Sequence, residues 1–386
     1  MYYYIYDLEI IYLPSGIKEK KKMAKQFKKI GVLTSGGDAP GMNAAVRAVT
    51  RYALSKGIEV YGIYEGYQGL IDGVGSIKKF SAGDVANIID KGGTMLYSAR
   101  CVQFKEEEYM QKAVQTCKEF GIDGIVTIGG DGTFRGASDL CKRGVPCIGI
   151  PGTIDNDITC TDNSIGFDTA MNTVIEAVDR LRDTCESHAR CNVVEVMGRN
   201  AGYIALETSI AVGATAVVVL EDSTYDEAVV IEKIKVARAA GKRNFVVIVA
   251  EGVDNYSEGL AKRIQAETGV ETKFARLAHI VRGGSPTLAD RVLASKMGVA
   301  AVDFLLEGKE NVFVCERDGE MVATDIQEAI VIDKLYKSSF TPGMTEPEAL
   351  KNYSPERQAE MRAFCEMRAK EVKELLNISE SISNYR

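Results

Sequence analysis

Short apolar runs alternate with helix-forming stretches from residue 29 onward, and this alternation limits the fold more than any other feature. The runs are continuous in Val and Ile rather than interrupted by polar residues, which indicates strands covered on both faces. Such strands, separated by helices, are typical of parallel sheets in α/β proteins. We predict strands at 29–34, 59–66, 123–129, 146–150, 192–198, 215–221 and 244–252. We predict helices at 42–54, from the turn at 128–133 to about 141, and at 168–185, 200–211, 225–240, 257–268 and 287–306.

The length of the chain is compatible with two domains or one large domain, because 386 residues provide ample core. We find no internal repeat and no low-complexity linker between the apolar runs. A domain boundary therefore falls within short loops, an arrangement that suits a cleft between two sheets.

The composition excludes several classes of protein. A formal net charge of −7 argues against extended nucleic-acid binding, so any basic site is local and suits a small anion. The nine cysteines are scattered and form no C-x-x-C pair, which favours reduced thiols in the cytoplasm over disulfides or a zinc site. Two histidines exclude a metal site rich in imidazole. No apolar run approaches the ~20 residues of a membrane span.

The N-terminal stretch is unusual. "MYYYIYDLEIIYL" carries acids where a signal peptide needs a basic start, and "KEKKKM" follows, so it is neither a secretion signal nor a span. We expect the functional protein to begin near Met23 and residues 1–22 to form a disordered extension. The alternative is an added surface strand.

The C-terminal stretch, from about Ser338, differs from the rest of the chain. Three prolines are followed by a charged helical segment at 355–376. Five apolar residues recur in this segment at roughly helical spacing: Met361, Phe364, Met367, Val372 and Leu375. The spacing predicts an amphipathic helix that docks on its own domain or on a neighbour, without catalytic chemistry.

Three glycine-rich turns follow predicted strands: "TSGGDAPG" (34–41), "IGGDGT" (128–133) and "PGTIDND" (151–157). Ligands of parallel α/β sheets bind beyond the carboxyl ends of the strands. Glycine lets backbone N–H groups approach an anion closely, and a following helix N-terminus favours negative charge. The turns therefore indicate a phosphate-bearing ligand, although a single turn of this kind is more often only a tight turn.

Two common nucleotide signatures are missing. The sequence contains no G-x-x-x-x-G-K-[ST], which excludes a P-loop enzyme. "GDGTFRG" has the wrong glycine spacing for G-x-G-x-x-G and no strong ribose-binding acid follows it, which disfavours hydride transfer.

Acids occur inside the glycine turns, at Asp131, Asp155 and Asp157, and nothing nearby in the sequence neutralises the last two. They would repel phosphates unless a cation intervenes. Mg²⁺ is the natural cation, because one or two carboxylates, phosphate oxygens and water usually hold it. The alternative is that Asp and Asn only cap helices or close turns, which explains single positions better than three acids at sheet ends.

Eight motifs, taken together and in order, closely resemble those of the bacterial ATP-dependent 6-phosphofructokinases (phosphofructokinase family A). They are "GVLTSGGDAPGMNAA", "GGTMLYSAR", "IGGDGT", "GIPGTIDNDI", "TDNSIGFDTA", "DRLRDT", "VVEVMGRNAG" and "HIVRGGSP", within residues 29–335. The resemblance implies two doubly wound α/β domains with mainly parallel sheets, an active site in the cleft between them, and a homotetramer. It implies an ATP-binding domain at 23–165 plus 280–335, a sugar-phosphate domain at 166–279 and a C-terminal extension at 336–386.

The implied reaction is the committed step of glycolysis, the phosphorylation of the 1-hydroxyl of fructose 6-phosphate from MgATP. By resemblance, Asp155 is the catalytic base, and Arg199 is the positive group beside the transferring phosphoryl. Thr153 orients the sugar, and Asp157 orients the sugar and the metal. The implied Mg²⁺ ligands are Asp131 and Asp157. The implied ATP contacts are Gly37, Arg100, Cys101, Gly130, Asp131, Gly132 and Thr133. Gly37 also counts among the catalytic positions, and Cys101 replaces an aromatic residue of some relatives, which weakens stacking on adenine.

The sugar phosphate needs a separate basic pocket, for which "HIVRGG" supplies His279 and Arg282. Arg190 and Lys273 join by resemblance, which also implies that a neighbouring subunit donates these two. Taken alone, His279 would more often be a core histidine. Lys273 replaces the usual arginine and loses its bidentate fork, so we expect weaker sugar-phosphate affinity. The other implied substrate contacts are Thr153, Ile154, Asp155, Met197, Gly198, Arg199 and Glu251.

Two glycines favour ATP as the phosphoryl donor. Pyrophosphate-dependent relatives usually carry Asp at the position of Gly132 and Lys at that of Gly152. The Asp would repel the α-phosphate of ATP, and the Lys would supply charge near the departing phosphate.

An effector site is implied less fully. Arg47 and Arg51 lie one helical turn apart, a spacing that taken alone is usual for a solvated helix face. The positions that match effector ligands are Arg47, Arg51, Arg182, Gly213, Lys242 and Arg243. Thr215, Ala240 and Lys79 depart from the usual Glu, Lys and Arg, so we expect an altered response to ADP and phosphoenolpyruvate.

Three rivals stay open at the level of sequence. They are a pyrophosphate-dependent enzyme of the same fold, an NAD-kinase-like protein with its own "GGDGT" turn, and a catalytically silent regulatory subunit. The second has no reason to carry "PGTIDND" and "HIVRGG" together, and the third requires a broken active site.

Overall fold

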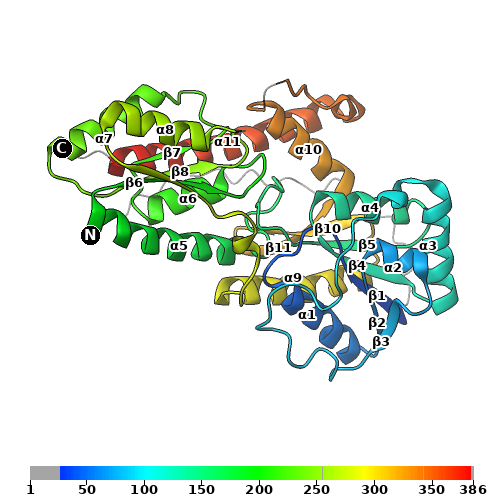
Figure 1. Cartoon of the computed structure of the whole chain (residues 1–386). Coiled ribbons are helices and arrows are strands. Elements are labelled where there is room, and N and C mark those ends of the chain that lie inside the picture. The colour runs from blue at the N-terminus through cyan, green and yellow to red at the C-terminus, as the bar shows by residue number, and fades with distance from the viewer. Residues whose placement is uncertain (1–26, 254, 342, 384–386) are drawn as a thin grey trace, which may run out of the picture.

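The computed structural model describes residues 27–253, 255–341 and 343–383 of the chain. The predicted extension at 1–22 lies outside the described residues. Two separate sheets organise the fold, and Figure 1 shows them in two parts of the molecule, with the long helices α5 (Phe167–His188) and α9 (Leu288–Leu306) in contact between them. Among the described residues, no helix is both long and apolar enough to cross a membrane.

The larger sheet has seven strands in the order β11-β10-β5-β4-β1-β2-β3. Its strands are β1 (Lys29–Thr34), β2 (Glu59–Ile63), β3 (Ile77–Phe80), β4 (Gly124–Gly129), β5 (Cys147–Pro151), β10 (Val312–Arg317) and β11 (Glu320–Asp325). Neighbours from β10 to β2 pair in parallel, whereas β3 and β11 pair antiparallel at the two edges. The central strands β4 and β5 are buried along their whole length, as expected for a sheet covered on both faces.

Helices cover this sheet on both faces. They are α1 (Met42–Ser55), α2 (Tyr67–Asp72), α3 (Glu107–Phe120), α4 (Asp131–Cys141), α9 (Leu288–Leu306) and α10 (Ile326–Ser338), with the 3₁₀ turn η1 (Val102–Lys105). Helices α1 and α9 pack against each other on one face, and α4 packs on β4 and β5 beside α3 and α10. This arrangement is the predicted doubly wound α/β fold.

The smaller sheet has four parallel strands in the order β7-β8-β6-β9. Its strands are β6 (Cys191–Val196), β7 (Ala216–Val218), β8 (Phe245–Ala250) and β9 (Thr272–Arg276). Its helices are α5 (Phe167–His188), α6 (Tyr203–Ala211), α7 (Glu227–Ala239) and α8 (Ser257–Thr268), and the 3₁₀ turn η2 (Ala278–Arg282) follows β9. Helices α5 and α6 pack on β6 and β8, while α8 packs on β6 and β9.

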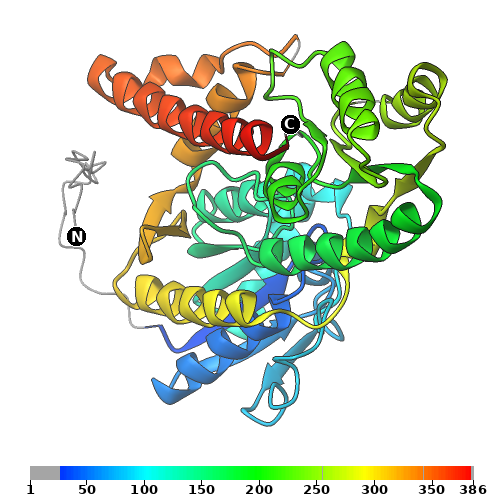
Figure 2. The same cartoon turned by 90° about the vertical axis from the view of Figure 1, so that its left-hand side faces the viewer.

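The C-terminal stretch forms the 3₁₀ turn η3 (Glu348–Asn352) and the long helix α11 (Pro355–Ser383). Helix α11 contacts α10 and α6, so it touches elements of both parts of the molecule (Figure 2). The predicted amphipathic helix is therefore confirmed, and it extends beyond residue 376. Met361 and Val372 are buried as expected, but Met367 is 43% exposed, so its place in the apolar stripe was wrong.

Several elements escaped prediction because they lack a long apolar run. The edge strands β3 and β9 read "IKKF" and "TKFAR", and their charged residues face solvent. The β10–β11 hairpin was missed, and β2 ends at Ile63 rather than at residue 66. All nine cysteines are free thiols, in agreement with the expectation of reduced cysteines.

Candidate active site

The three glycine turns meet at one edge of the larger sheet. They follow β1, β4 and β5, which are neighbours in the sheet, and the chain order of the strands reverses between β1 and β4. Ser35 donates its backbone N–H to Ile128 at 3.0 Å, and Thr133 Oγ1 donates to the carbonyl of Ser35 at 3.0 Å. Gly152 N–H donates to the Gly129 carbonyl at 2.9 Å. These contacts form the crevice in which open α/β sheets bind ligands.

The smaller sheet brings a second set of groups to the same place from the ends of β6 and β8. Arg199 follows β6 and Glu251 follows β8, and the two strands are neighbours. The backbone N–H of Arg199 donates to Glu251 Oε1 at 3.0 Å, which fixes the turn. Arg199 has a φ of 51°, a left-handed conformation that is strained for a residue with a long side chain.

Asp155 and Arg199 join the two parts of the site. Arg199 Nε lies 3.3 Å from Asp155 Oδ2, and the carboxylate side chain is 2% exposed whereas the arginine is 62% exposed. Asp155 Oδ1 is buried and has no hydrogen-bond partner in the protein. One oxygen of the carboxylate is thus paired, while the other is available to a ligand.

The environment of Asp155 makes it a stronger base than an ordinary aspartate. Burial raises its pKa to about 6, and the neighbouring charge of Asp157 adds to the rise. The charges of Arg199 and Arg282 oppose it, and that of Glu251 supports it. A pKa near 6 leaves the carboxylate ionised at neutral pH but able to accept a proton, which is what general-base catalysis requires.

The loop that carries Asp155 is shaped by its own polar residues. Asn156, between the two aspartates, has a φ of 48°, a conformation that asparagine tolerates better than most residues. Its side-chain N–H donates to the carbonyl of Asp162 at 3.0 Å. Thr153 Oγ1 accepts from the backbone N–H of Asp155 at 3.2 Å. Ile154, in contrast, is completely buried in the core, so its side chain does not reach the site.

The acids of the turns do have cationic partners, which come from distant parts of the chain for Asp155 and Asp157 and from the same helix for Asp131. Lys337 on α10 lies 3.0 Å from Asp157 Oδ2, and both side chains are less than one-fifth exposed. Asp131 pairs with Arg135, one turn along α4, at 2.8 Å and is 41% exposed. The expectation of unneutralised acids was therefore wrong, because it considered only neighbours in sequence.

The fit of these acids to Mg²⁺ depends on their donor chemistry. Burial opposes the charge of Lys337, but the charges of Asp157 and Asp333, with a smaller contribution from Asp131, raise its pKa, so Asp157 and Asp131 both interact with this cation. Hard carboxylate oxygens with room for phosphate and water match the preference of Mg²⁺. Within the described residues, no group of three or more Asp, Glu, His or Cys forms a ready-made metal cage. The residues fit a metal that phosphates help to hold.

The turn after β1 lies against the side chain of Arg282. A Cβ atom added at Gly37 would lie 2.7 Å from Arg282 Nη1, and the same nitrogen donates to the Asp38 carbonyl at 3.1 Å. Arg282, expected in the sugar pocket, thus lies against the first glycine turn. Arg100 is exposed, and Cys101 packs against the core of the larger sheet.

A cavity of about 450 Å³ lies beside Arg199. Its lining consists of Glu195, Arg199, Asn200, Glu251, Gly252, Asn255 and Arg276. Arg276 escaped the sequence analysis although it lies three residues before His279, and it pairs with Glu195 at 2.6 Å. Met197 is buried, and Gly198 has a φ of 137° that favours glycine. His279 is exposed, so the alternative of a core histidine is wrong.

Arg190 and Lys273 are close together but far from this cavity. Both pair with Glu271, at 2.7 and 2.8 Å respectively. They lie at the amino ends of the parallel strands β6 and β9, whereas Arg199 follows the carboxyl end of β6. Six residues at ~3.3 Å each separate these ends by ~20 Å. The two cations therefore lie far from Arg199 of the same chain.

The predicted effector residues form two groups. Arg182 donates to the carbonyl of Val212, beside Gly213, and burial together with the Arg182 charge lowers the pKa of Lys242. Arg182 Nε is buried and unpartnered. Arg243 donates to the carbonyls of Glu186 and Ser187. Arg47 and Arg51 lie on α1 in the other part of the molecule, with Arg47 Nε also buried and unpartnered.

Three positions carry residues other than those usual at the effector site, and each has its own surroundings. Thr215 is buried and its hydroxyl has no hydrogen-bond partner. Lys79 pairs with Glu59 at 2.6 Å, so its ammonium group already has an acidic partner. Ala240 closes the C-terminus of α7 through backbone hydrogen bonds only.

Comparison with known proteins agrees with this architecture. The chain is 53% identical over 308 residues to an ATP-dependent 6-phosphofructokinase of Bacillus pumilus, covering 80% of this chain and 95% of the relative. It is 51% identical over 314 residues to ATP-dependent 6-phosphofructokinase 1 of Clostridium perfringens, covering 81% and 97%. Phosphofructokinase from Saccharomyces cerevisiae superposes with a TM-score of 0.78 at 32% identity over 87% of this chain and 50% of the yeast chain.

A pyrophosphate-dependent phosphofructokinase from Marinobacter aquaeolei has a TM-score of 0.67 at 20% identity, covering 88% of this chain and 92% of that one, which shows the shared fold. The sequence profile of the family described as "Phosphofructokinase" matches residues 29–305, more than two-thirds of the chain. This match and the identity to the bacterial relatives show that the chain belongs to the phosphofructokinase family.

Proposed function

We propose that this protein is an ATP-dependent 6-phosphofructokinase, which transfers the γ-phosphoryl group of ATP to the 1-hydroxyl of fructose 6-phosphate in the committed step of glycolysis. The observation that carries the proposal is the pair of Asp155 and Arg199, buried base beside exposed cation, where two sheets meet at three glycine turns. Relatives that share about half of the sequence bear the same name.

In this function Asp155 is the general base. Its unpartnered Oδ1 accepts the proton of the sugar hydroxyl as the oxygen attacks the γ-phosphorus. Thr153 and Asn156 hold the backbone on either side, so the carboxylate keeps its direction. Arg199 stabilises the negative charge that spreads over the phosphoryl oxygens during transfer.

ATP lies along the turns after β1 and β4 in this proposal. Backbone N–H groups of the turns and the N-terminus of α4 suit its phosphates. Asp131 and Asp157 are the residues that would hold Mg²⁺, and the metal would supply positive charge to neutralise the phosphates.

ATP rather than pyrophosphate is the expected donor. A Cβ at Gly132 would meet no atom within 4 Å, so this position leaves open space on the phosphate side of the turn. A Cβ at Gly152 would lie 3.1 Å from Met42 and 3.2 Å from Ile128, which resists the lysine of pyrophosphate-dependent relatives.

Assembly and control complete the proposal. We expect a homotetramer in which Arg190 and Lys273 complete a neighbour's sugar-phosphate pocket with His279. Arg182 and Lys242, two cations held close together, support an effector site for a phosphate-bearing ligand such as ADP or phosphoenolpyruvate. The nine free thiols support a reducing compartment, the cytoplasm.

An assay of the purified protein with fructose 6-phosphate and either MgATP or Mg-pyrophosphate tests the function. We expect fructose 1,6-bisphosphate from MgATP alone, and the absence of product from MgATP would refute the proposal. Replacing Asp155 with asparagine keeps the shape but removes the base, so turnover should fall by about 10²–10⁴-fold. Sugar binding, measured by calorimetry, should persist. Repeating the assay with ADP and phosphoenolpyruvate tests the effector site.

A further inference from the structure

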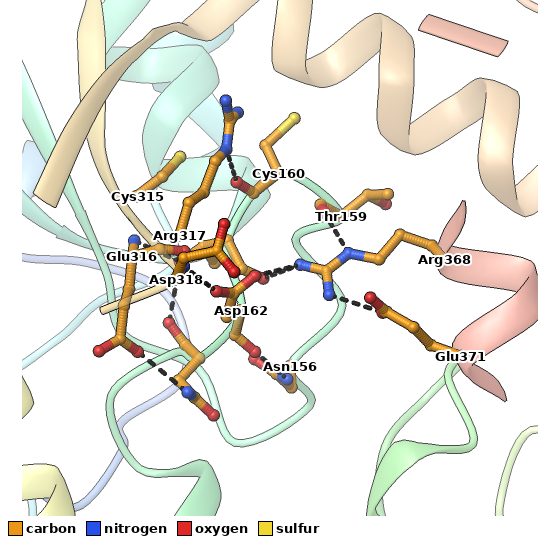
Figure 3. Close-up of polar contacts among 12 residues, drawn as sticks. Asn156, Thr159, Cys160, Asp162, Cys315, Glu316, Arg317, Asp318, Arg368 and Glu371 are labelled. Carbon is orange, nitrogen blue, oxygen red and sulfur yellow. Dashed lines mark hydrogen bonds and ion pairs between the residues drawn. The ribbon is translucent and has the colours of Figure 1, made fainter. Parts of the chain in front are cut away.

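The C-terminal helix α11 makes contacts with the loop that carries the catalytic base. This helix lies outside residues 29–305, the part of the chain that matches the family. We use the term catalytic loop for residues 155–162. Arg368 on α11 points its guanidinium group toward the part of this loop that contains Thr159 and Thr161 (Figure 3).

The guanidinium of Arg368 binds the loop through three acceptors. Its Nε donates to the Thr159 carbonyl at 3.2 Å. Its Nη2 donates to the Thr161 carbonyl at 2.9 Å and to Asp162 Oδ1 at 3.0 Å. Nη1 donates to Glu371 Oε2 at 2.9 Å on its own helix, which sets the plane of the group. The side chain of Arg368 is 11% exposed. Hydrogen bonds from a charged donor at so buried a position are stronger than neutral ones.

The β10–β11 hairpin holds the other side of the same loop, as Figure 3 also shows. Asp318 N–H donates to Asp162 Oδ2 at 2.8 Å, and Asp162 N–H donates to the Glu316 carbonyl at 2.8 Å. Arg317 Nε donates to the Cys160 carbonyl at 3.0 Å. The carboxylate of Asp162 is therefore held between the hairpin and Arg368, with one oxygen toward each.

We call the hydrogen bonds from Arg368 to Thr159, Thr161 and Asp162 the grip of α11 on the loop. Asp162 connects this grip to the catalytic base. Its carbonyl accepts from Asn156 Nδ2 at 3.0 Å, which closes the loop on itself next to Asp155. A shift of Asp162 would move Asn156, whose left-handed backbone directly follows Asp155. Arg368 is thus linked by two consecutive polar contacts to Asn156, the residue bonded to Asp155.

The loop has space to move if the grip is lost. A cavity of about 110 Å³ lies against it, lined on the other side by Tyr203, Glu207, Arg368 and Glu371. Ile158 and Cys160 of the loop pack in the core, but core packing does not fill this space, so polar contacts restrain the loop on this side. Removing the guanidinium would enlarge the cavity and free two carbonyls and one oxygen of the Asp162 carboxylate.

We propose that Arg368 is a positioning residue for phosphoryl transfer: by holding Thr159, Thr161 and Asp162 it fixes the direction of Asp155. The inference rests on the proposed kinase function. The residues expected to bind the sugar phosphate, Arg190, Lys273 and His279, lie on other elements, and the first two pair with Glu271. Loss of the grip should therefore affect turnover more than sugar binding, because misplacement of a base by about 1 Å can cost up to about 10²-fold in rate.

The test compares three variants of the full-length protein. Arg368→Ala removes the grip, and Arg368→Lys keeps the charge but cannot reproduce the planar fork. Arg362→Ala is the matched control, since Arg362 lies on the same helix and pairs only with Glu346 at the surface. We expect Arg368→Ala to lower kcat per folded molecule by about 10–100-fold with KM for fructose 6-phosphate changed less than about 2-fold. Arg368→Lys should lie between, and Arg362→Ala should match the wild type.

A role confined to stability would give a different result. Arg368→Ala would then lower the melting temperature and the yield of folded protein but leave kcat per folded molecule unchanged, and this outcome would overturn the proposal. An equal loss in kcat for Arg362→Ala would also overturn it.

Hydrogen exchange of the backbone amides tests the grip without any assay of activity. We expect faster exchange at residues 156–162 in Arg368→Ala than in Arg362→Ala, and equal exchange would contradict the proposal. If the wild type made no product from MgATP, the proposed function would fail, whereas the exchange result would still report whether α11 holds the loop.

Discussion

At the scale of single residues, Asp155 and Arg199 of the site are both held in unfavourable environments. Asp155 is buried with one unpaired oxygen, and Arg199 adopts a strained backbone conformation beside it. Such features reduce stability and persist where function requires them. The cost can be measured, because the pKa of Asp155 differs between the folded and unfolded chains.

Replacing Asp155 with asparagine should stabilise the protein in a pH-dependent way. The folded-state pKa is about 6 and the usual value is 3.8, so the folded state binds the proton more tightly. The contribution of this group to stability is fully present below pH 3.8 and is lost as the pH rises through 6. The advantage of Asp155→Asn over the wild type should therefore grow by roughly 1 kcal/mol between pH 5 and pH 8.

Urea unfolding of both proteins at these pH values, without Mg²⁺ or ATP, measures the effect. Asp179→Asn, at an exposed position on α5, shows what the same substitution does outside the site. An advantage of Asp155→Asn that shrinks toward pH 8 would show that burial does not destabilise the ionised carboxylate.

At the scale of elements, sequence patterns predicted what depends on local order and missed what depends on distant partners. The central strands and the glycine turns were predictable, because continuous apolar runs and glycine spacing are local signals. The partner of Asp157 was not, since Lys337 lies 180 residues away and only the fold brings it there. Likewise, the spacing of apolar residues in the C-terminal stretch predicted a helix, but nothing in that stretch identified the catalytic loop as the partner of the helix.

Helix α5 shows the same limit at its N-terminus. Its N-cap is Gly166, with a φ of 103° and no side chain to cap the helix. Asp290 of α9 supplies the cap from another part of the chain, accepting from Gly166 N–H at 2.7 Å and Thr169 N–H at 2.8 Å. Asp290 is 1% exposed. This carboxylate thereby fastens α5 of the smaller sheet to α9 of the larger one.

We expect Asp290→Ala to lower the free energy of unfolding by about 1–3 kcal/mol, because it leaves two buried N–H groups without acceptors. Chemical denaturation measures the change. Asp226→Ala, which removes a local and more exposed cap at α7, provides a comparison and should cost about 1 kcal/mol or less. Equal costs for the two substitutions would mean that the connection between α5 and α9 adds nothing beyond a normal cap.

At the scale of the whole molecule, groups that we expect to serve the active site lie at opposite ends of strand β6 in the smaller sheet. Arg199 follows the carboxyl end of β6, whereas Arg190 precedes its amino end, beside Lys273 on β9. A strand of this length keeps the two ends ~20 Å apart. Within one chain Arg190 therefore stays far from Asp155, and in the proposed assembly a second copy completes the site.

This division predicts complementation between two inactive variants. Asp155→Asn removes the base, and Arg190→Ala removes a cation that serves the neighbouring subunit, so each assembly alone should have little activity at low sugar concentration. When the two are co-expressed and assemble at random, half of the sites receive an intact Asp155 and half of those receive an intact Arg190. About a quarter of the wild-type activity should then return.

The comparison that isolates the effect is a mixture of the separately purified variants, assayed before their subunits exchange. This mixture should show only the sum of the two residual activities, because every site in it contains one defect. Recovery that appears on co-expression and not on simple mixing requires sites shared between chains. If co-expression also yields only the sum, Arg190 and Asp155 belong to the same chain's site or to none, and the proposed assembly is wrong.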